Sequence, residues 1–139
     1  MNYGLCTMNY ELKKYLALAA LPLLLCCGKE ASPEEVALQT AKVYYEQLLA
    51  GDVESFVGGM DAKDSVYPSY RRQLEANMRM FLAQQEAEHK GIVRVEPLRF
   101  DTDSTLHHVN AFLLFVYGDS TREEIVVPMV ERERVWKMR

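Results

Sequence analysis

The chain has 139 residues, three cysteines and a formal net charge of −4 at neutral pH. Nucleic-acid binding needs a basic face, so a mildly acidic chain is a poor candidate for it, and we expect no nucleic-acid partner. The cysteines are Cys6, Cys26 and Cys27. The rest of the chain therefore cannot hold a disulfide, a thiol nucleophile or a cysteine metal site, and we predict no cofactor.

The amino-terminal stretch has the pattern of an export signal. Lys13 and Lys14 precede an apolar run over residues 15–25, which is interrupted by Pro22. This run is shorter than the roughly 20 apolar residues of a membrane-spanning helix, and it fits the ~7–15 of a secretory signal. The positive flank would hold the start of the segment on the cytoplasmic side. Met8 is an alternative start, which would shorten the positive region.

The end of the apolar run resembles the lipobox of bacterial lipoproteins, in which small residues precede a cysteine that is lipidated before cleavage. The residue before Cys27 is the small Cys26, whereas Cys26 itself follows a bulky leucine. We therefore predict lipidation of Cys27, a signal peptide over 1–26 and a tether over 27–31. Two or more acyl chains give stable anchoring. The alternatives are lipidation of Cys26, or a plain signal peptide or short anchor with incidental cysteines.

Three helices are predicted after the tether. Ser32 suits the N-cap of the first, Pro33 its first position, and Glu35 completes a capping box. That helix should end at Gly51. Asp52 can cap a second, short helix. A third helix is predicted over about 69–90, and the long helices carry apolar stripes that should pack against one face of a sheet.

In the rest of the chain, apolar and polar residues alternate as they do in β-strands. Pro97 removes a ladder donor, so its strand should lie at an edge or carry a bulge. The strand Leu106–Tyr117 is apolar on both faces apart from Asn110, which predicts a central position. Turns are expected at Asp101–Thr105 and Glu131–Arg134. The predicted strands are Ile92–Phe100, Leu106–Tyr117, Glu123–Val130 and Val135–Met138. Helices followed by strands indicate the α+β class.

Several pieces resemble the nuclear-transport-factor-two-like fold: Gly51-Asp52 followed by Phe56, the long third helix, and the ending Val135-Trp136-Lys137. The resemblance implies a cone over residues 32–139, with three amino-terminal helices packed on a curved antiparallel sheet of about four strands. With the lipobox, the chain resembles small bacterial lipoproteins that carry such a cystatin-like domain of unknown function. Family members often have a glycine in the turn before the last tryptophan, and this chain has none there.

The resemblance implies a pocket between sheet and helices. The candidate pocket-lining residues are Tyr44, Tyr45, Asn110 and Trp136. The alternative for the two tyrosines is that they are amphipathic core residues whose hydroxyl groups reach water. Asn110 is expected either to bond a neighbouring loop or to face the pocket.

The fold also resembles that of enzymes such as ketosteroid isomerase and polyketide cyclases. Catalysis of that kind would require a buried carboxylate base and a proton donor in this chain. The predicted strands carry few carboxylates, and Glu96 and Glu124 are expected in solvent, so we predict no catalytic residue. His107 and His108 are adjacent on a predicted strand, where neighbouring side chains point to opposite faces. We therefore predict no metal site.

These observations predict a non-enzymatic lipoprotein of the bacterial cell envelope, anchored on the periplasmic or cell-surface face of a membrane. Its domain would bind a small apolar ligand or a protein partner. The sheet face away from the helices offers a surface for a homodimer or an envelope protein. The alternative is an isomerase- or cyclase-like enzyme.

Overall fold

The structure is a computed structural model, and it describes residues 30–61 and 67–139. Residues 31–139 form one compact unit. The predicted signal peptide and Cys27 lie outside the described residues. Among the residues described, no helix has the length and hydropathy to cross a membrane.

The first two helices begin as their sequences predict. Helix α2 spans Pro33–Leu49, and its capping box is confirmed: the Ser32 hydroxyl accepts from the Glu35 N–H at 3.2 Å, and the Glu35 carboxylate accepts from the Ser32 N–H at 2.9 Å. Gly51 follows in the left-handed region, with φ +86°. Helix α3 spans Val53–Gly58, and hydrogen bonds from Ser55 cap it and lower the pKa of Asp52.

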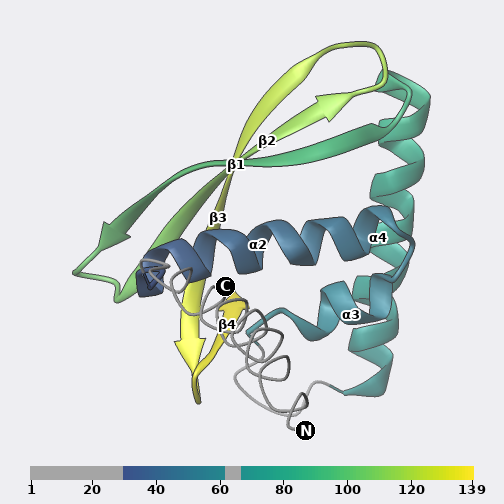
Figure 1. Cartoon of the computed structure of the whole chain (residues 1–139). Helices are drawn as coiled ribbons and strands as arrows, with labels where there is room; N and C mark the ends of the chain where they lie inside the picture. The colour runs from purple at the N-terminus through teal and green to yellow at the C-terminus, as the bar shows by residue number, and fades with distance from the viewer. Residues whose placement is uncertain (1–29, 62–66) are drawn as a thin grey trace, which may run out of the picture. The chain divides into compact units, whose positions relative to one another are not determined.

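Helix α4 spans Pro68–His89, so it starts one residue earlier than predicted. Its carboxyl end is fixed to the hairpin between strands β2 (His108–Tyr117) and β3 (Arg122–Arg132). The Gly118 N–H donates to the Gly91 carbonyl at 2.9 Å, and the Asp119 N–H donates to the His89 carbonyl at 3.0 Å. Gly118 approaches the Lys90 carbonyl so closely that any side chain there would collide with it. Figure 1 shows α4 standing across the end of α2, with this hairpin at its tip.

Four antiparallel strands form one sheet in the order β1-β2-β3-β4. Pro97 lies on the edge strand at a register shift, as predicted, and Leu106–Tyr117 is confirmed as largely a central strand. The predicted turn at Asp101–Thr105 is partly wrong, because Asp101, Thr102 and Asp103 pair with β2. The strands are β1 (Ile92–Asp103), β2 (His108–Tyr117), β3 (Arg122–Arg132) and β4 (Val135–Met138).

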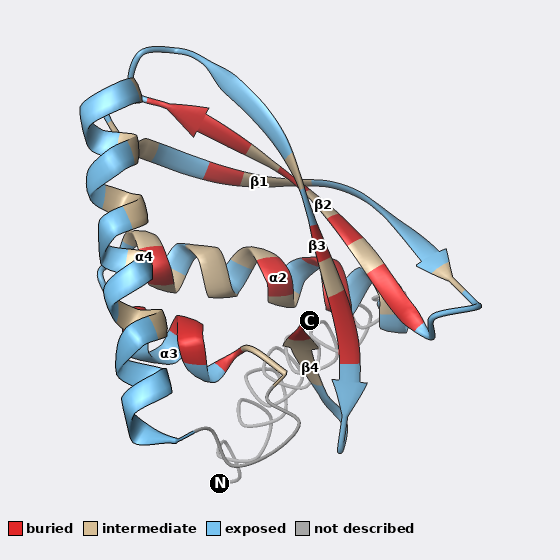
Figure 2. Cartoon of the chain, turned by 180° about the vertical axis from the view of Figure 1, so that it is seen from behind, coloured by how far each residue is buried: buried red, intermediate tan, exposed pale blue. Residues whose placement is uncertain are grey.

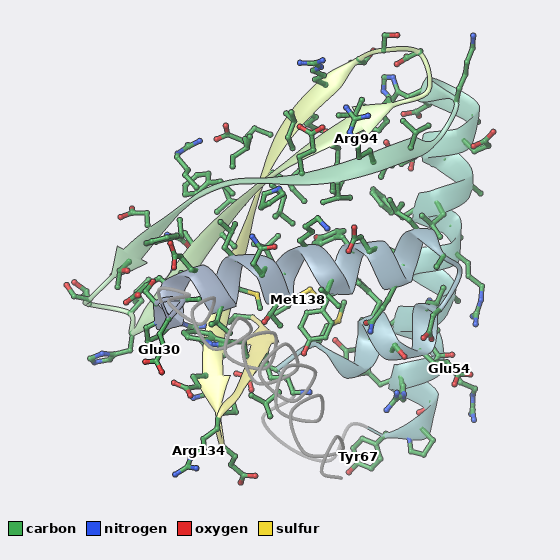
Figure 3. All side chains as sticks on the ribbon, in the orientation of Figure 1. Glu30, Glu54, Tyr67, Arg94, Arg134 and Met138 are labelled. Carbon is green, nitrogen blue, oxygen red and sulfur yellow. The ribbon has the colours of Figure 1, made fainter. Side chains whose placement is uncertain are left out.

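The last turn is shorter than the predicted Glu131–Arg134. Strand pairing continues to Arg132↔Val135, so only Glu133 and Arg134 form the turn. Their φ values are 50° and 66°, the left-handed conformation that two-residue hairpins favour and that usually selects asparagine and glycine. Figure 3 shows Arg134 at the tip of this hairpin, pointing away from the sheet.

The core lies between α2 and the inner face of the sheet. Leu48, Leu113 and Met129 are fully buried there. The predicted packing of both long helices is confirmed for α2 and only partly for α4, within which no residue is buried. In Figure 2 the buried positions follow β2, β3 and one side of α2, while α4 is intermediate or exposed. The fold class is α+β, with three helices packed on a four-stranded antiparallel sheet.

Candidate functional site

Two adjoining hollows of about 620 and 340 Å³ lie along α4 and β3, and the larger one is also lined by α3, by Met60 and Asp61, and by the end of β4. They share Tyr45, Phe56 and Val126, so they lie side by side, and we treat them together as the α4–β3 groove. Its remaining wall residues include Leu74, Met78 and Phe81 from α4, and Glu123, Ile125 and Val127 from β3.

The helix wall of the groove is an apolar stripe that the fold leaves half covered. Leu74, Met78 and Phe81 pack against the core while staying partly exposed, and Tyr70 retains 56% of its surface. An amphipathic helix normally turns such a stripe into its own core. The sheet reaches this stripe only partly, because the anchored hairpin holds α4 at one end of the sheet.

Aromatic rings form the floor of the groove. Tyr45 of α2 meets Phe56 and Phe115 edge-on, with ring centroids 5.1 and 5.3 Å apart. Burial raises the pKa of Tyr45, so its phenol keeps its proton through the physiological range. The floor is therefore an uncharged apolar surface.

A carboxylate and a phenol meet at one end of the groove. The hydroxyl of the buried Tyr117 donates to a Glu123 oxygen at 2.5 Å. Burial raises the pKa of Tyr117, and the hydrogen bond to Glu123 and the negative charge of Glu123 raise it further. Glu96 and Glu124 are the strand carboxylates that the sequence pattern drew attention to, and Glu123 was missed. The alternation of β3 could have found it, since Glu123 shares the inner face with Ile125.

An ion pair lies at the other end. Arg132 contacts both Asp61 oxygens at 2.8–3.3 Å, and the Asp61 side chain is only 8% exposed. The hydrogen bonds that Arg132 donates to Asp61, and then the charge of Asp61, raise the pKa of Arg132. The two residues are 71 positions apart, and no sequence pattern relates them.

The four predicted pocket-lining residues are not gathered at one place. Tyr45 lines both hollows of the groove. Tyr44 and Trp136 instead tie α2 to β4, since the Tyr44 hydroxyl donates to the Trp136 carbonyl at 2.9 Å. Asn110 lies beside the His108 ring, 3.0 Å from its Nε2, so the loop expected as its partner is replaced by a residue of its own strand. Neither Tyr44, Asn110 nor Trp136 lines the groove.

The two adjacent histidines, His107 and His108, lie around the start of β2. His107 lies in the turn before β2, with φ 52°, so it is not on the strand as predicted. Within residues 30–61 and 67–139, no three potential metal-ligating side chains gather at one point.

The sheet face away from the helices is partly covered by the chain's own charges. The Arg99 guanidinium lies 3.9 Å from the Phe112 ring centroid and binds both Glu124 oxygens at 2.7 and 2.9 Å. This pairing raises the pKa of Arg99 and lowers that of Glu124. A partner on this face stays a prediction.

No protein-family model matches the sequence, and no curated protein matches it. A crystal structure from Campylobacter jejuni, of a protein named as a candidate NTF2-like transpeptidase, matches the structure with a TM-score of 0.56. The match covers 72% of this chain and 94% of that chain at 14% sequence identity. Likeness at this identity shows the fold alone, and the predicted nuclear-transport-factor-two-like fold is confirmed: the described domain has an NTF2-like fold.

Proposed function

We propose that the chain is a lipid-anchored protein of the bacterial cell envelope, and that its NTF2-like domain binds an apolar partner in the α4–β3 groove without catalysing a reaction. The observation that carries this is the stripe of α4, which faces the groove and has no buried residue. Fully burying one large apolar side chain contributes roughly 1.5–3 kcal/mol. The half-covered side chains of α4 would therefore gain part of this free energy when a bound partner buries them.

The chemistry of the lining supports binding over turnover. Serine, threonine, cysteine, lysine and histidine are common nucleophiles of covalent catalysis, alongside tyrosine and carboxylates, and each is activated by a base or by a shifted pKa. The described lining of the two hollows contains no serine, threonine, cysteine, lysine or histidine. We therefore do not propose for this chain the transpeptidase activity that the name of the Campylobacter protein suggests.

The predicted anchor is tested at the amino terminus of the mature protein. The Cys27→Ser variant should lose acylation and membrane association, measured by mass spectrometry and by fractionation of the envelope. The Cys26→Ser variant is the control, because it keeps a small residue before the predicted lipidation site. Acylation that persists in Cys27→Ser and disappears in Cys26→Ser would contradict the choice of Cys27.

The groove is tested with a photo-crosslinking amino acid in the full chain in its own envelope. Met78 lines the groove, whereas Met80 is on the same helix and 69% exposed. A benzophenone side chain at position 78 should give a defined adduct, and one at position 80 should not. The mass of the adduct separates a small ligand from a protein. Equal labelling at both positions, or none at either, would contradict the proposal.

The Tyr117–Glu123 pair favours a second candidate, an isomerase- or cyclase-like enzyme, because it puts a carboxylate within reach of a phenol. The carboxylate belongs to an exposed residue, unlike the buried base that such chemistry favours. Isomerisation of a β,γ-unsaturated ketone, followed by ultraviolet absorbance, tests this candidate. Turnover that is abolished by Glu123→Gln would replace the binding function.

A further inference from the structure

Along the edge that borders the groove, part of strand β3 is not paired with any strand in the described part of the chain. Strand β4 pairs only with the far half of β3, from Met129 to Arg132. Within the described residues, no strand pairs with that edge between Arg122 and Val127. The other edge of β3 is paired with β2 along this whole stretch.

The direction of the free backbone groups follows from one hydrogen bond. The Pro128 carbonyl accepts from the Arg139 N–H at 2.8 Å, so Pro128 turns its backbone toward the β4 side. Backbone groups of alternate residues in an antiparallel strand point to the same side. The N–H and C=O groups of Arg122, Glu124 and Val126 therefore point to the edge with which no other described strand pairs.

This edge opens into the groove. The side chains of Val126 and Val127 point to opposite faces of the sheet, with Val127 buried and Val126 50% exposed. Both residues nevertheless line the groove. The depression therefore reaches the edge of β3, where the free backbone groups lie, while the apolar stripe of α4 forms the facing wall.

We propose that the occupant of the α4–β3 groove is an extended segment of a partner polypeptide, which adds a strand to the free edge of β3. This inference rests on the proposed function and narrows its partner class. Strand addition takes affinity from main-chain hydrogen bonds and specificity from pockets for alternate side chains. The edge supplies the hydrogen bonds, and the half-covered residues of α4 supply the apolar contacts.

The geometry also selects a peptide over a small apolar molecule. A small apolar molecule would cover Met78 and Phe81 but would leave the backbone groups of Glu124 and Val126 without partners. Covering polar groups without bonding them is unfavourable. A strand antiparallel to β3 would continue the line of β4 and bond both residues.

The test uses a synthetic ten-residue peptide of alternating threonine and valine, with a lysine at each end, and the full chain in detergent. Hydrogen–deuterium exchange should show protection of the amides of Glu124 and Val126 when the peptide is added. The control peptide carries N-methyl groups on alternate residues of its pairing edge. It should bind at least roughly tenfold more weakly, because it has lost those hydrogen bonds and kept its side chains.

Two variants address the protein side of the same bonds. Val126→Pro removes one free donor, and its sheet pairing with β2 should survive because that N–H points away from β2. Val126→Thr keeps the donor and a similar shape. Peptide binding should fall in the first and persist in the second, at equal thermal stability.

Other results would overturn the inference in recognisable ways. Equal binding of the N-methylated peptide would show that the groove takes apolar groups without strand pairing, and the proposed function would stand. Protection that grows with protein concentration in the absence of peptide would assign the edge to a second copy of the chain. A crosslinked small molecule at position 78, with no peptide protection, would assign the groove to a small ligand.

Discussion

The hairpin between β3 and β4 should become more stable when its turn residues are replaced by those that its backbone favours. Glu133 and Arg134 have φ values of 50° and 66°. A left-handed conformation costs a residue with a Cβ roughly 1–2 kcal/mol, and asparagine and glycine tolerate it best. Glycine gives back about 0.5–1 kcal/mol through its greater freedom in the unfolded chain. The double variant Glu133→Asn, Arg134→Gly should therefore gain about 1 kcal/mol.

The gain is measurable by thermal unfolding followed by circular dichroism. A change of 1 kcal/mol shifts the midpoint by about 4–8 °C in a domain of 60–100 residues, so a rise of about 4 °C is expected here. Both wild-type side chains are exposed, which leaves the backbone as the source of the effect. The control is Arg122→Gly at the start of β3, which should lose about 0.5–1 kcal/mol. An unchanged or lowered midpoint in the double variant would refute the left-handed turn.

Three further predictions concern packing and pH. Gly59→Ala should lose about 1–3 kcal/mol by denaturant unfolding, since the new Cβ would lie 2.5 Å from a tyrosine ring of α2. Gly58→Ala, with its nearest neighbour at 3.6 Å, is the control and should be close to wild type. Burial raises the pKa of Tyr117 above its ordinary 10.0, so the stability that it contributes is complete below pH 10 and is lost as the pH rises further. Tyr117→Phe should flatten this alkaline loss, and an equally steep loss would contradict the assignment. Hydrogen bonds within its turn, and then from the neighbouring histidine, lower the pKa of Asp119 from 3.8 to about 2. Its contribution is therefore present above pH 3.8 and is lost toward pH 2, and Asp119→Asn should remove that part of the acid dependence of unfolding.

Local chemistry explains the part of the fold that could be predicted from the sequence. Ser32 and Glu35 form their capping box from residues within one helical turn, and Pro97 marks its bulge because it lacks an N–H. The apolar run around Leu113 also predicts a central strand from local sequence, because a strand that is apolar on both faces is typical of the middle of a sheet. Such features need no information about distant residues.

The parts that could not be predicted depend on distant partners. Arg132 reads as a turn residue, yet Asp61 holds it at the end of β3 from 71 positions away. Asn110 was expected to bond a loop, and its partner is His108 on the same strand. The free edge of β3 was not predicted either, because it depends on the register in which the short β4 pairs with β3.

The candidate site also has one part that could be predicted from local sequence and one part that depends on distant residues. Tyr45 was predicted to line a pocket, and it forms the floor of the groove. The apolar stripe of α4 was also recognised, but its spacing cannot tell whether such a face meets its own core or a partner. The position of α4 decides this, and two backbone hydrogen bonds near its end set that position.

The most direct test of the proposed groove measures whether it is occupied in the cell. A thiol introduced by Met78→Cys or Met80→Cys can be labelled with a maleimide, since the sequence after Cys27 contains no other cysteine. With a partner in the groove, the thiol at position 78 should react slowly in intact envelopes and quickly after purification, while the thiol at position 80 reacts quickly in both. Equal rates for position 78 in the two preparations would show that the groove is empty in its native setting and would contradict the proposed function.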